Sequence, residues 1–141
     1  MRRLCYVSQA NFPLPQHHHH LTDILTEARD FNVRHHIQGV LYFADGRFLQ
    51  CLEGLADDLE RLVTRLQGDP RHHSMQMIMN QPINGAIFAA WSMKFVSRHH
   101  RVKQFFQQQG HTIFCPELLN KSQLAQLLEL LYQLEAQNLV A

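Results

Sequence analysis

Apolar residues recur with two different periods along residues 1–96. Alternation with period two, or a short apolar run, predicts β-strands over 3–8, 37–43, 46–54, 75–79 and 91–96. Apolar residues spaced at i, i+3, i+4 and i+7 predict one helix from Leu21 to near Asn32 and a second over 57–66. The predicted order of elements is therefore β-α-β-β-α-β-β.

From residue 97 onward the pattern is helical only. Val102, Phe105 and Phe106 predict a short helix, and a second one begins at Asn120, where Gln123 has the spacing of a capping box. The second helix carries an apolar stripe made of Leu124, Leu127, Leu128, Leu131 and Leu134. The predicted class is α+β: a ferredoxin-like βαββαββ unit with a mixed sheet and two helices on one face, plus two C-terminal helices. This divides the chain into a domain over 1–96 and an extension over 97–141.

The strand predicted over 46–54 contains one polar side chain in an apolar setting. Phe48, Gln50 and Leu52 share one face, and Leu49 and Cys51 share the other, which is typical of a central strand. A primary amide is costly to bury unless its donors and its carbonyl find partners. Either the chain or a bound polar molecule must therefore satisfy Gln50.

Two further polar residues are expected near this amide. In a split βαβ arrangement the first and third strands are neighbours, which sets Tyr6 beside Gln50 on the face that the helices cover. Asn32, at the end of the first predicted helix, would lie at the rim of the same space. A phenol and two amides on an apolar wall suit a flat heterocycle with polar edges. A purely structural Tyr–Gln hydrogen bond remains the alternative on the residues alone.

Composition bounds the classes of function that remain. With 141 residues, 45% of them hydrophobic and 18% charged, the chain is expected to fold as an ordinary globular protein. Its formal net charge of +1 gives no long-range attraction to nucleic acid or to an anionic membrane. No apolar run approaches the ~20 residues that span a bilayer, and no secretory signal precedes the first strand. Three widely spaced cysteines predict free thiols and a cytoplasmic location.

The eleven histidines are the unusual feature of the composition. His17 to His20 form a run, for which we expect a solvated loop rather than a metal site, because no cysteine or carboxylate has structural-site spacing. A short basic group at Arg98, Arg101 and Lys103 lacks the interleaved aromatic residues of a nucleic-acid site.

Five segments together resemble one known family. They are RLCYVS at 3–8, Asn32 with IQG at 37–39, GRFLQCLEG at 46–54, DPRHH at 69–73 and WSM at 91–93. In this order and spacing they resemble the BLUF family, sensors of blue light using flavin, over residues 1 to 96. The resemblance implies a bound flavin, with FAD expected and FMN or riboflavin as alternatives.

The resemblance also implies roles for individual residues. Tyr6 matches the photoactive tyrosine, and Gln50 matches the switch glutamine that bridges this tyrosine to the flavin. Asn32 matches the asparagine that binds the pyrimidine edge of the ring. Arg71 and His72 match a basic site near the ribityl or phosphate chain. A rearranged Gln50 amide would strengthen a hydrogen bond to the flavin and shift its absorption to the red.

Signal output is implied by the same comparison. Trp91 and Met93 match strand positions that change contacts as the signal leaves the pocket. Gln38 and Phe31 depart from the usual pattern, where threonine and a polar residue are common, and this bears on cofactor affinity and dark recovery. The stripe of leucines and the apolar end at 139–141 are the expected contact surfaces.

The predicted function is a blue-light photoreceptor without catalytic turnover. It would act on a separate protein, such as a transcriptional regulator, or through self-association. Two other classes stay open on the residues alone. One is a small ferredoxin-like enzyme or ligand-binding domain, with Tyr6 as general acid and His72 or Asn32 as helper. The other is a histidine-based metal or pH sensor.

Overall fold

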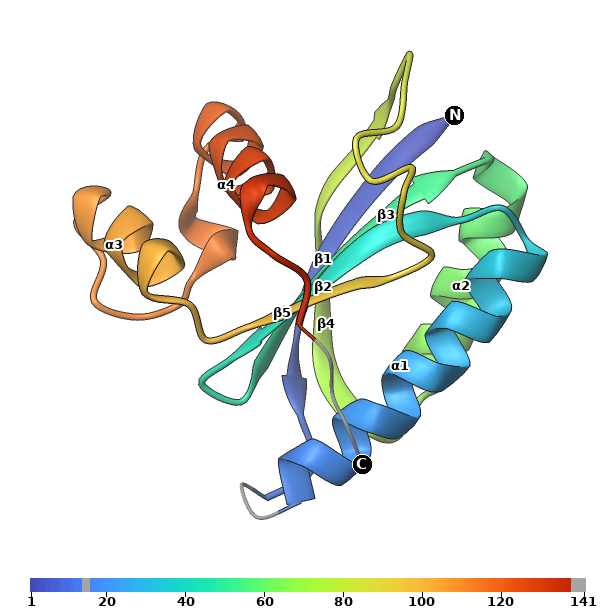
Figure 1. Cartoon of the computed structure of the whole chain (residues 1–141), viewed down its shortest axis with the longest axis horizontal. Helices are drawn as coiled ribbons and strands as arrows, with labels where there is room; N and C mark the ends of the chain where they lie inside the picture. Colours follow the sequence, from blue (N-terminus) through green and yellow to red (C-terminus); the bar gives the residue numbers. More distant parts are fainter. Residues whose placement is uncertain (14–15, 138–141) are drawn as a thin grey trace.

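The structure, a computed structural model, describes residues 1–13 and 16–137 (Figure 1). Its strands are β1 (Arg2–Ala10), β2 (Gln38–Ala44), β3 (Arg47–Gly54), β4 (His72–Pro82) and β5 (Lys94–Ser97). Its helices are α1 (His17–Arg34), α2 (Ala56–Gln67), α3 (His100–Gln108), the 3₁₀ turn η2 (Pro116–Leu118) and α4 (Lys121–Gln133). The strands form one sheet in the order β4-β1-β3-β2-β5. Only the β2–β5 pair is parallel among these, so the sheet is mixed, as predicted.

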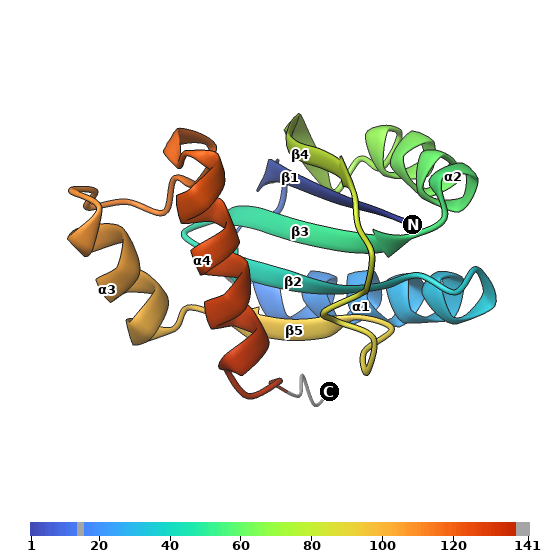
Figure 2. The same ribbon diagram turned by 90° about the horizontal axis from the view of Figure 1, so that it is seen from above.

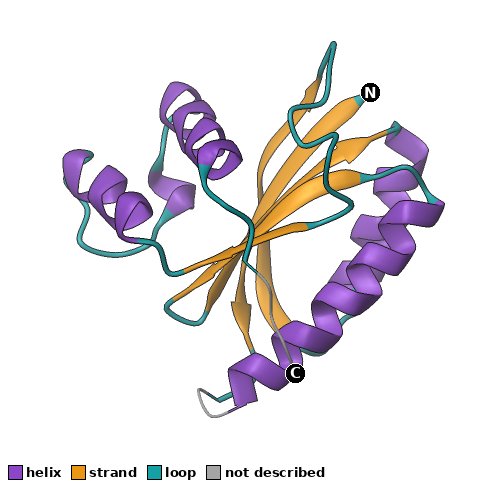
Figure 3. Ribbon diagram, viewed as in Figure 1, coloured by secondary structure: helices purple, strands orange, loops and turns teal. Residues whose placement is uncertain are grey.

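Helices cover both faces of the sheet. Helices α1 and α2 lie on one face, and α4, with α3 beside it, lies on the other (Figures 2 and 3). Each face has its own apolar cluster, which we call the α1/α2 side and the α4 side. The two predicted helices on one face and the two C-terminal helices are therefore confirmed.

Strand β3 is central and distributes its side chains as its sequence predicts. Phe48 and Leu52 belong to the α1/α2 side, whereas Leu49 and Cys51 belong to the α4 side. The β2–β3 hairpin closes through Asp45 and Gly46, both with positive φ (55° and 73°), the backbone of a tight two-residue turn. At Gly39, a Cβ would lie 2.2 Å from the carbonyl oxygen of residue 51, so this strand pair requires glycine there.

The histidine run is helical, and the predicted loop is wrong. Helix α1 begins at His17, so the four histidines make up its first turn. The rings of His17 and His20 lie 5.2 and 4.6 Å from the ring of Phe12, which is itself buried. Tertiary contact with an aromatic side chain therefore extends the helix beyond the apolar stripe that predicts it.

Strands β4 and β5 also differ from their predicted ranges. Strand β4 reaches His72–Pro82 because it pairs with nearly all of β1. Strand β5 begins at Lys94, so Trp91 and Met93 lie in the segment before it rather than on one face of a strand. Met93 packs on the α1/α2 side, whereas Trp91 packs against the α4 side.

The leucine stripe of α4 is buried, which corrects the prediction that it forms a contact surface. Its members, Leu124, Leu127, Leu128, Leu131 and Leu134, are at most 5% exposed and pack against the sheet. The capping box of Asn120 and Gln123 is confirmed. The predicted contact surface at 139–141 lies outside the described residues. No helix in the described part of the chain is long and apolar enough to cross a membrane.

Candidate functional site

Tyr6 and Gln50 face each other across the β1–β3 pair. Antiparallel register makes them direct partners, and both side chains are almost fully buried. The Tyr6 hydroxyl donates a hydrogen bond to Gln50 Oε1. On the other side, Gln50 Nε2 lies 3.8 Å from the sulfur of Met93. The amide therefore has a strong partner at its oxygen and only a weak acceptor, a thioether, at its nitrogen.

Burial keeps the Tyr6 phenol protonated. Removal from water raises the pKa of Tyr6 well above its usual value, and the negative charge of Asp69 raises it further. At neutral pH Tyr6 is therefore a hydrogen-bond donor.

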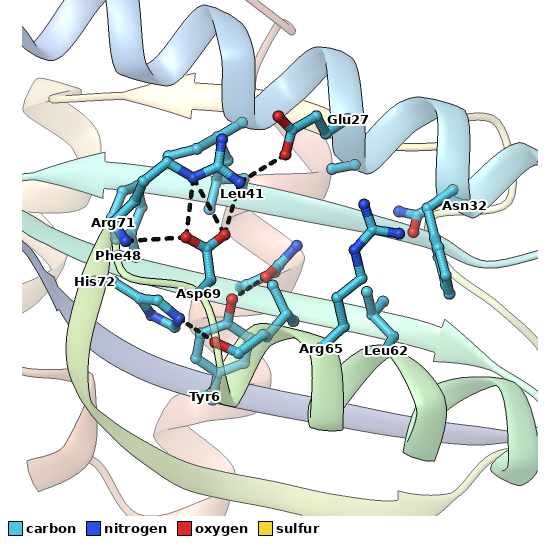
Figure 4. A pocket seen from close by; sticks show the side chains of 15 residues that line it. Tyr6, Glu27, Asn32, Leu41, Phe48, Leu62, Arg65, Asp69, Arg71 and His72 are labelled. Carbon is cyan, nitrogen blue, oxygen red and sulfur yellow. Dashed lines mark hydrogen bonds and ion pairs between the residues drawn. The ribbon is translucent and has the colours of Figure 1, made fainter.

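Both residues line one cavity, which lies between α1 and α2 (Figure 4). The cavity has an empty volume of about 630 Å³, part of it open to solvent. Its apolar lining comes from both helices and from the strands, through Ile24, Ala28, Phe31, Leu41, Phe48, Leu62 and Leu66. Its polar lining consists of Tyr6, Glu27, Asn32, Gln50, Arg65, Asp69, Arg71 and His72.

Asn32 presents an unsatisfied acceptor in this cavity. Its side chain is fully buried near the end of α1, and its Nδ2 donates to the backbone oxygen of Ser92 at 2.6 Å. Its Oδ1 is buried and accepts from none of the described residues. Because an unpaired buried carbonyl is costly, a bound molecule with an N–H donor would be stabilised there.

A charged cluster lies at the opposite end of the cavity from Asn32 (Figure 4). Arg71 pairs with Asp69 at 2.6 Å and with Glu27 at 2.7 Å, so one cation meets two carboxylates. Burial alone would raise the pKa of Asp69, but the hydrogen bonds and charge of Arg71 outweigh it and lower that pKa. The same carboxylates raise the pKa of Arg71.

The side chain of His72 is held by the protein itself. Its Nε2 lies 2.6 Å from the backbone oxygen of Leu66, which can only accept, so Nε2 carries the hydrogen. Its Nδ1 lies 2.8 Å from the Ser8 hydroxyl, which donates to it when the ring is neutral. His72 therefore forms part of the cavity wall, and its ring lies 6.1 Å from that of Tyr6.

Comparison with known proteins identifies this arrangement. A family model described as sensors of blue-light using FAD matches residues 1–94. The chain belongs to the BLUF family. As such it is a blue-light sensor that binds a flavin, and the identification rests on most of the chain rather than on a single motif.

This BLUF protein is similar both to proteins of about its own length and to part of a much longer protein. The structure of photo-activated BlsA superposes with a TM-score of 0.93 at 42% identity, covering 97% of this chain and 98% of BlsA. The BLUF protein BlrB, at 24% identity and a TM-score of 0.75 over 92% of both chains, shares the fold. The photoactivated adenylate cyclase subunit alpha of Euglena gracilis is 28% identical over 77% of this chain. The matched part is 11% of that cyclase, so the chain spans about a tenth of its length.

The cavity of this BLUF protein fits a flavin in its donor and acceptor groups. The unpaired Oδ1 of Asn32 can accept a hydrogen bond from an N–H at the edge of a pyrimidine-like ring. The buried Gln50 amide lines the same cavity. Tyr6, Asn32, Gln50, Arg71 and His72, which the sequence predicts to lie near the cofactor, all line this one cavity. Met93 is brought to Gln50, but Trp91 is not.

Charged lining residues were missed by the sequence analysis of this BLUF protein. Glu27, Arg65 and Asp69 line the cavity, and the Arg65 guanidinium lies 5.1 Å above the ring of Phe31. A signal for two of them was present. Glu27 follows Ile24, and Arg65 follows Leu62, by the i, i+3 spacing that sets residues on one helix face.

Proposed function

We propose that this BLUF protein binds FAD between α1 and α2 and that Tyr6 and Gln50 are its photoactive pair. The observation that carries the proposal is the buried Gln50 amide, hydrogen-bonded to the Tyr6 phenol and adjacent to a cavity that also holds the orphan Asn32 oxygen. In this proposal Asn32 binds the edge of the ring. Arg71 and His72 lie beside the ribityl or phosphate chain, with Arg65 as a further cation.

The bound flavin supplies absorption of blue light and an acceptor for an electron. Tyr6 holds its hydroxyl proton against Gln50 Oε1, and the Gln50 nitrogen faces the Met93 sulfur. Half a turn of the amide exchanges these ends, so that Nε2 faces Tyr6 and Oε1 faces Met93. Because Nε2 has only a thioether partner, this turn breaks one strong hydrogen bond rather than two.

Signal output is proposed to run from Met93 towards α4. Met93 adjoins Lys94, whose Nζ donates to the backbone oxygen of Tyr132 at 2.8 Å and lies 4.3 Å from the ring of Trp91. Residues 1–96 would then act as the sensor and residues 97–141 as the output unit. A cytoplasmic protein, such as a transcriptional regulator, is the proposed receiver, with self-association as the other route.

The rival classes draw less support from the site. A phenol whose pKa is raised is a poor general acid at neutral pH, which disfavours an enzyme built on Tyr6. No group of three or more histidine, cysteine or acidic side chains suited to a metal ion occurs within residues 1–13 and 16–137.

The test uses Gln50→Leu, which removes the amide and keeps its volume close to that of the original. We expect the wild-type protein to be yellow, to release FAD on denaturation, and to show a reversible red shift of its flavin bands in blue light. Gln50→Leu should retain flavin and lose the shift, because no group remains to exchange its hydrogen bonds.

Gln76→Leu on β4, at a position outside the cavity lining, is the matched control and should keep the shift. A red shift of full size in Gln50→Leu would refute the proposed switch. Extraction of FMN or riboflavin in place of FAD would refute the choice of cofactor alone.

A further inference from the structure

A second cavity lies on the far side of β2 from the flavin cavity. It is bounded by the β2–β3 turn, the beginning of α3 and the segment 111–114, all at the same end of the molecule (Figure 1). Its empty volume is about 990 Å³, part of it open to solvent. None of its lining residues lines the flavin cavity.

The rim of this second cavity is basic. Arg98 and Lys103 are basic side chains, and His99, His100 and His111 add imidazoles. Asp45 is the carboxylate of the lining, and it lies 3.3 Å from Arg98 with both side chains mostly exposed. An exposed ion pair of this kind is weak, so an incoming anion can replace Asp45 as the partner of Arg98.

A buried hydroxyl adds a free donor. Tyr42 is 2% exposed, and its oxygen accepts the backbone N–H of His99 at 3.1 Å. Among the described residues none accepts the Tyr42 hydroxyl proton. Burial raises the pKa of Tyr42, so the hydroxyl stays a donor at neutral pH. An acceptor in the cavity would complete its hydrogen bonding.

The floor of the cavity is apolar. Val102, Phe106 and Phe114 are buried there, and the Phe114 ring lies 5.0 Å from that of Tyr42. Ile113 stands at the edge with 64% of its surface exposed. Water reaches the apolar lining mainly at Ile113, because Val102, Phe106 and Phe114 are at most 7% exposed, and a simple inorganic anion would leave Ile113 uncovered. A ligand with an apolar body would cover it.

We propose that this cavity binds a small amphipathic organic anion, a carboxylate carried on an aliphatic or aromatic body. The carboxylate accepts from the Tyr42 hydroxyl and pairs with Lys103 and Arg98. The body lies against the exposed side chain of Ile113. The proposal does not depend on which flavin is bound or on the switch at Gln50.

The test is a titration of the flavin-loaded, dark-kept full chain, followed by amide chemical shifts and by calorimetry. Octanoate is the probe, octanol has the same body without charge, and inorganic phosphate has charge without the body. We expect saturable octanoate binding with the largest shifts at Tyr42, His99 and Val102. Octanol should bind roughly tenfold more weakly or worse, because it lacks the charge-assisted hydrogen bonds of the carboxylate. Phosphate should also bind roughly tenfold more weakly or worse, because it leaves the apolar lining uncovered.

Variants decide whether the assigned residues hold the probe. Lys103→Gln should weaken octanoate binding by roughly tenfold, and Tyr42→Phe should weaken it as well. Lys121→Gln, at the exposed beginning of α4 and outside the cavity, is the matched control and should bind as wild type. Three results would each overturn the proposal. Octanoate binding does not saturate, octanol or phosphate binds as tightly as octanoate, or Lys103→Gln and Lys121→Gln weaken octanoate binding equally.

Discussion

At the residue scale, several buried polar side chains lie on the neighbouring strands β1 and β3. Tyr6 and Gln50 are partners across β1 and β3. Glu53, one residue before the end of the β1–β3 pairing, is fully buried and lies 2.7 Å from Arg3. Glu53 also accepts the backbone N–H groups of Ile87 and Phe88. Strand β3 therefore places Gln50 in the cavity and, through Glu53, binds the segment that leads to Trp91.

Tyr6 makes stability depend on pH in the alkaline range. Its pKa is raised in the folded protein above the ordinary 10.0. Its contribution is thus fully present below pH 10 and is lost as pH rises further, because the unfolded chain ionises first. We expect the free energy of unfolding of the wild type to fall more steeply than that of Tyr6→Phe as pH rises above 10. Urea denaturation at each pH measures this.

Tyr132, which is 44% exposed, provides the comparison for this experiment. Tyr132→Phe is the control for loss of a tyrosine hydroxyl and should leave the free energy of unfolding at neutral pH close to its wild-type value. Equal slopes for wild type and Tyr6→Phe would contradict the assigned cause, since the buried phenol would then contribute nothing to the pH dependence.

At the element scale, β5 and α4 are joined by one buried cation. Lys94 is 1% exposed at the start of β5, and its ammonium meets the backbone oxygen of Tyr132 in the last turn of α4. A cation is favourable at that end of a helix because unpaired carbonyls gather there. Burial lowers the pKa of Lys94.

Lys94→Met tests whether this contact carries the light signal. Methionine keeps an unbranched apolar stem and removes the ammonium, so flavin binding and the red shift should persist. The light-minus-dark difference in hydrogen exchange at the end of α4 should fall, because β5 no longer holds the Tyr132 carbonyl. Lys121→Met is the control at the opposite end of α4. An unchanged exchange difference in Lys94→Met would remove this residue from the output path.

The sequence predicts the elements whose cause is local. The β2–β3 turn at Asp45-Gly46 and the capping box at Asn120 depend on neighbouring residues, and both are confirmed. The first turn of α1 and the start of β5 depend on contacts with distant residues, such as the ring of His17 with that of Phe43 at 4.9 Å and the pairing of Lys94 with Val40. Those boundaries were therefore wrong.

At the scale of the whole molecule, α4 covers one face of the sheet. Its leucine stripe shares an apolar cluster with Cys5, Val7, Leu49 and Cys51. Periodicity predicts that such a stripe is apolar, but it does not distinguish a buried face from a docking surface, so the predicted contact surface on this stripe is wrong. The same limit applies to the site. Family motifs identify Tyr6, Gln50 and Asn32. The two carboxylates that pair with Arg71 can be recognised only from the folded structure.

Leu127→Ala tests how far the C-terminal helices belong to the core. Leu127 is fully buried, so the truncation should lower the free energy of unfolding by about 2–5 kcal/mol. Leu118→Ala, at a side chain that is 62% exposed, should change it by less than about 0.5 kcal/mol. Urea denaturation followed by circular dichroism and by Trp91 fluorescence measures both. Separate transitions for the two signals would contradict a shared core.

The segment after α4 closes one border of the sheet. The Gln137 backbone N–H donates to Phe95 O at 2.8 Å, and its side chain bonds both to the Ser97 hydroxyl and to the Ser97 carbonyl. These bonds occupy groups that β5 would otherwise offer to a foreign strand. A partner protein that displaced this segment would expose the edge of β5, to which another strand could then add. Occupation of that border by the chain itself thus guards against indiscriminate polymerisation.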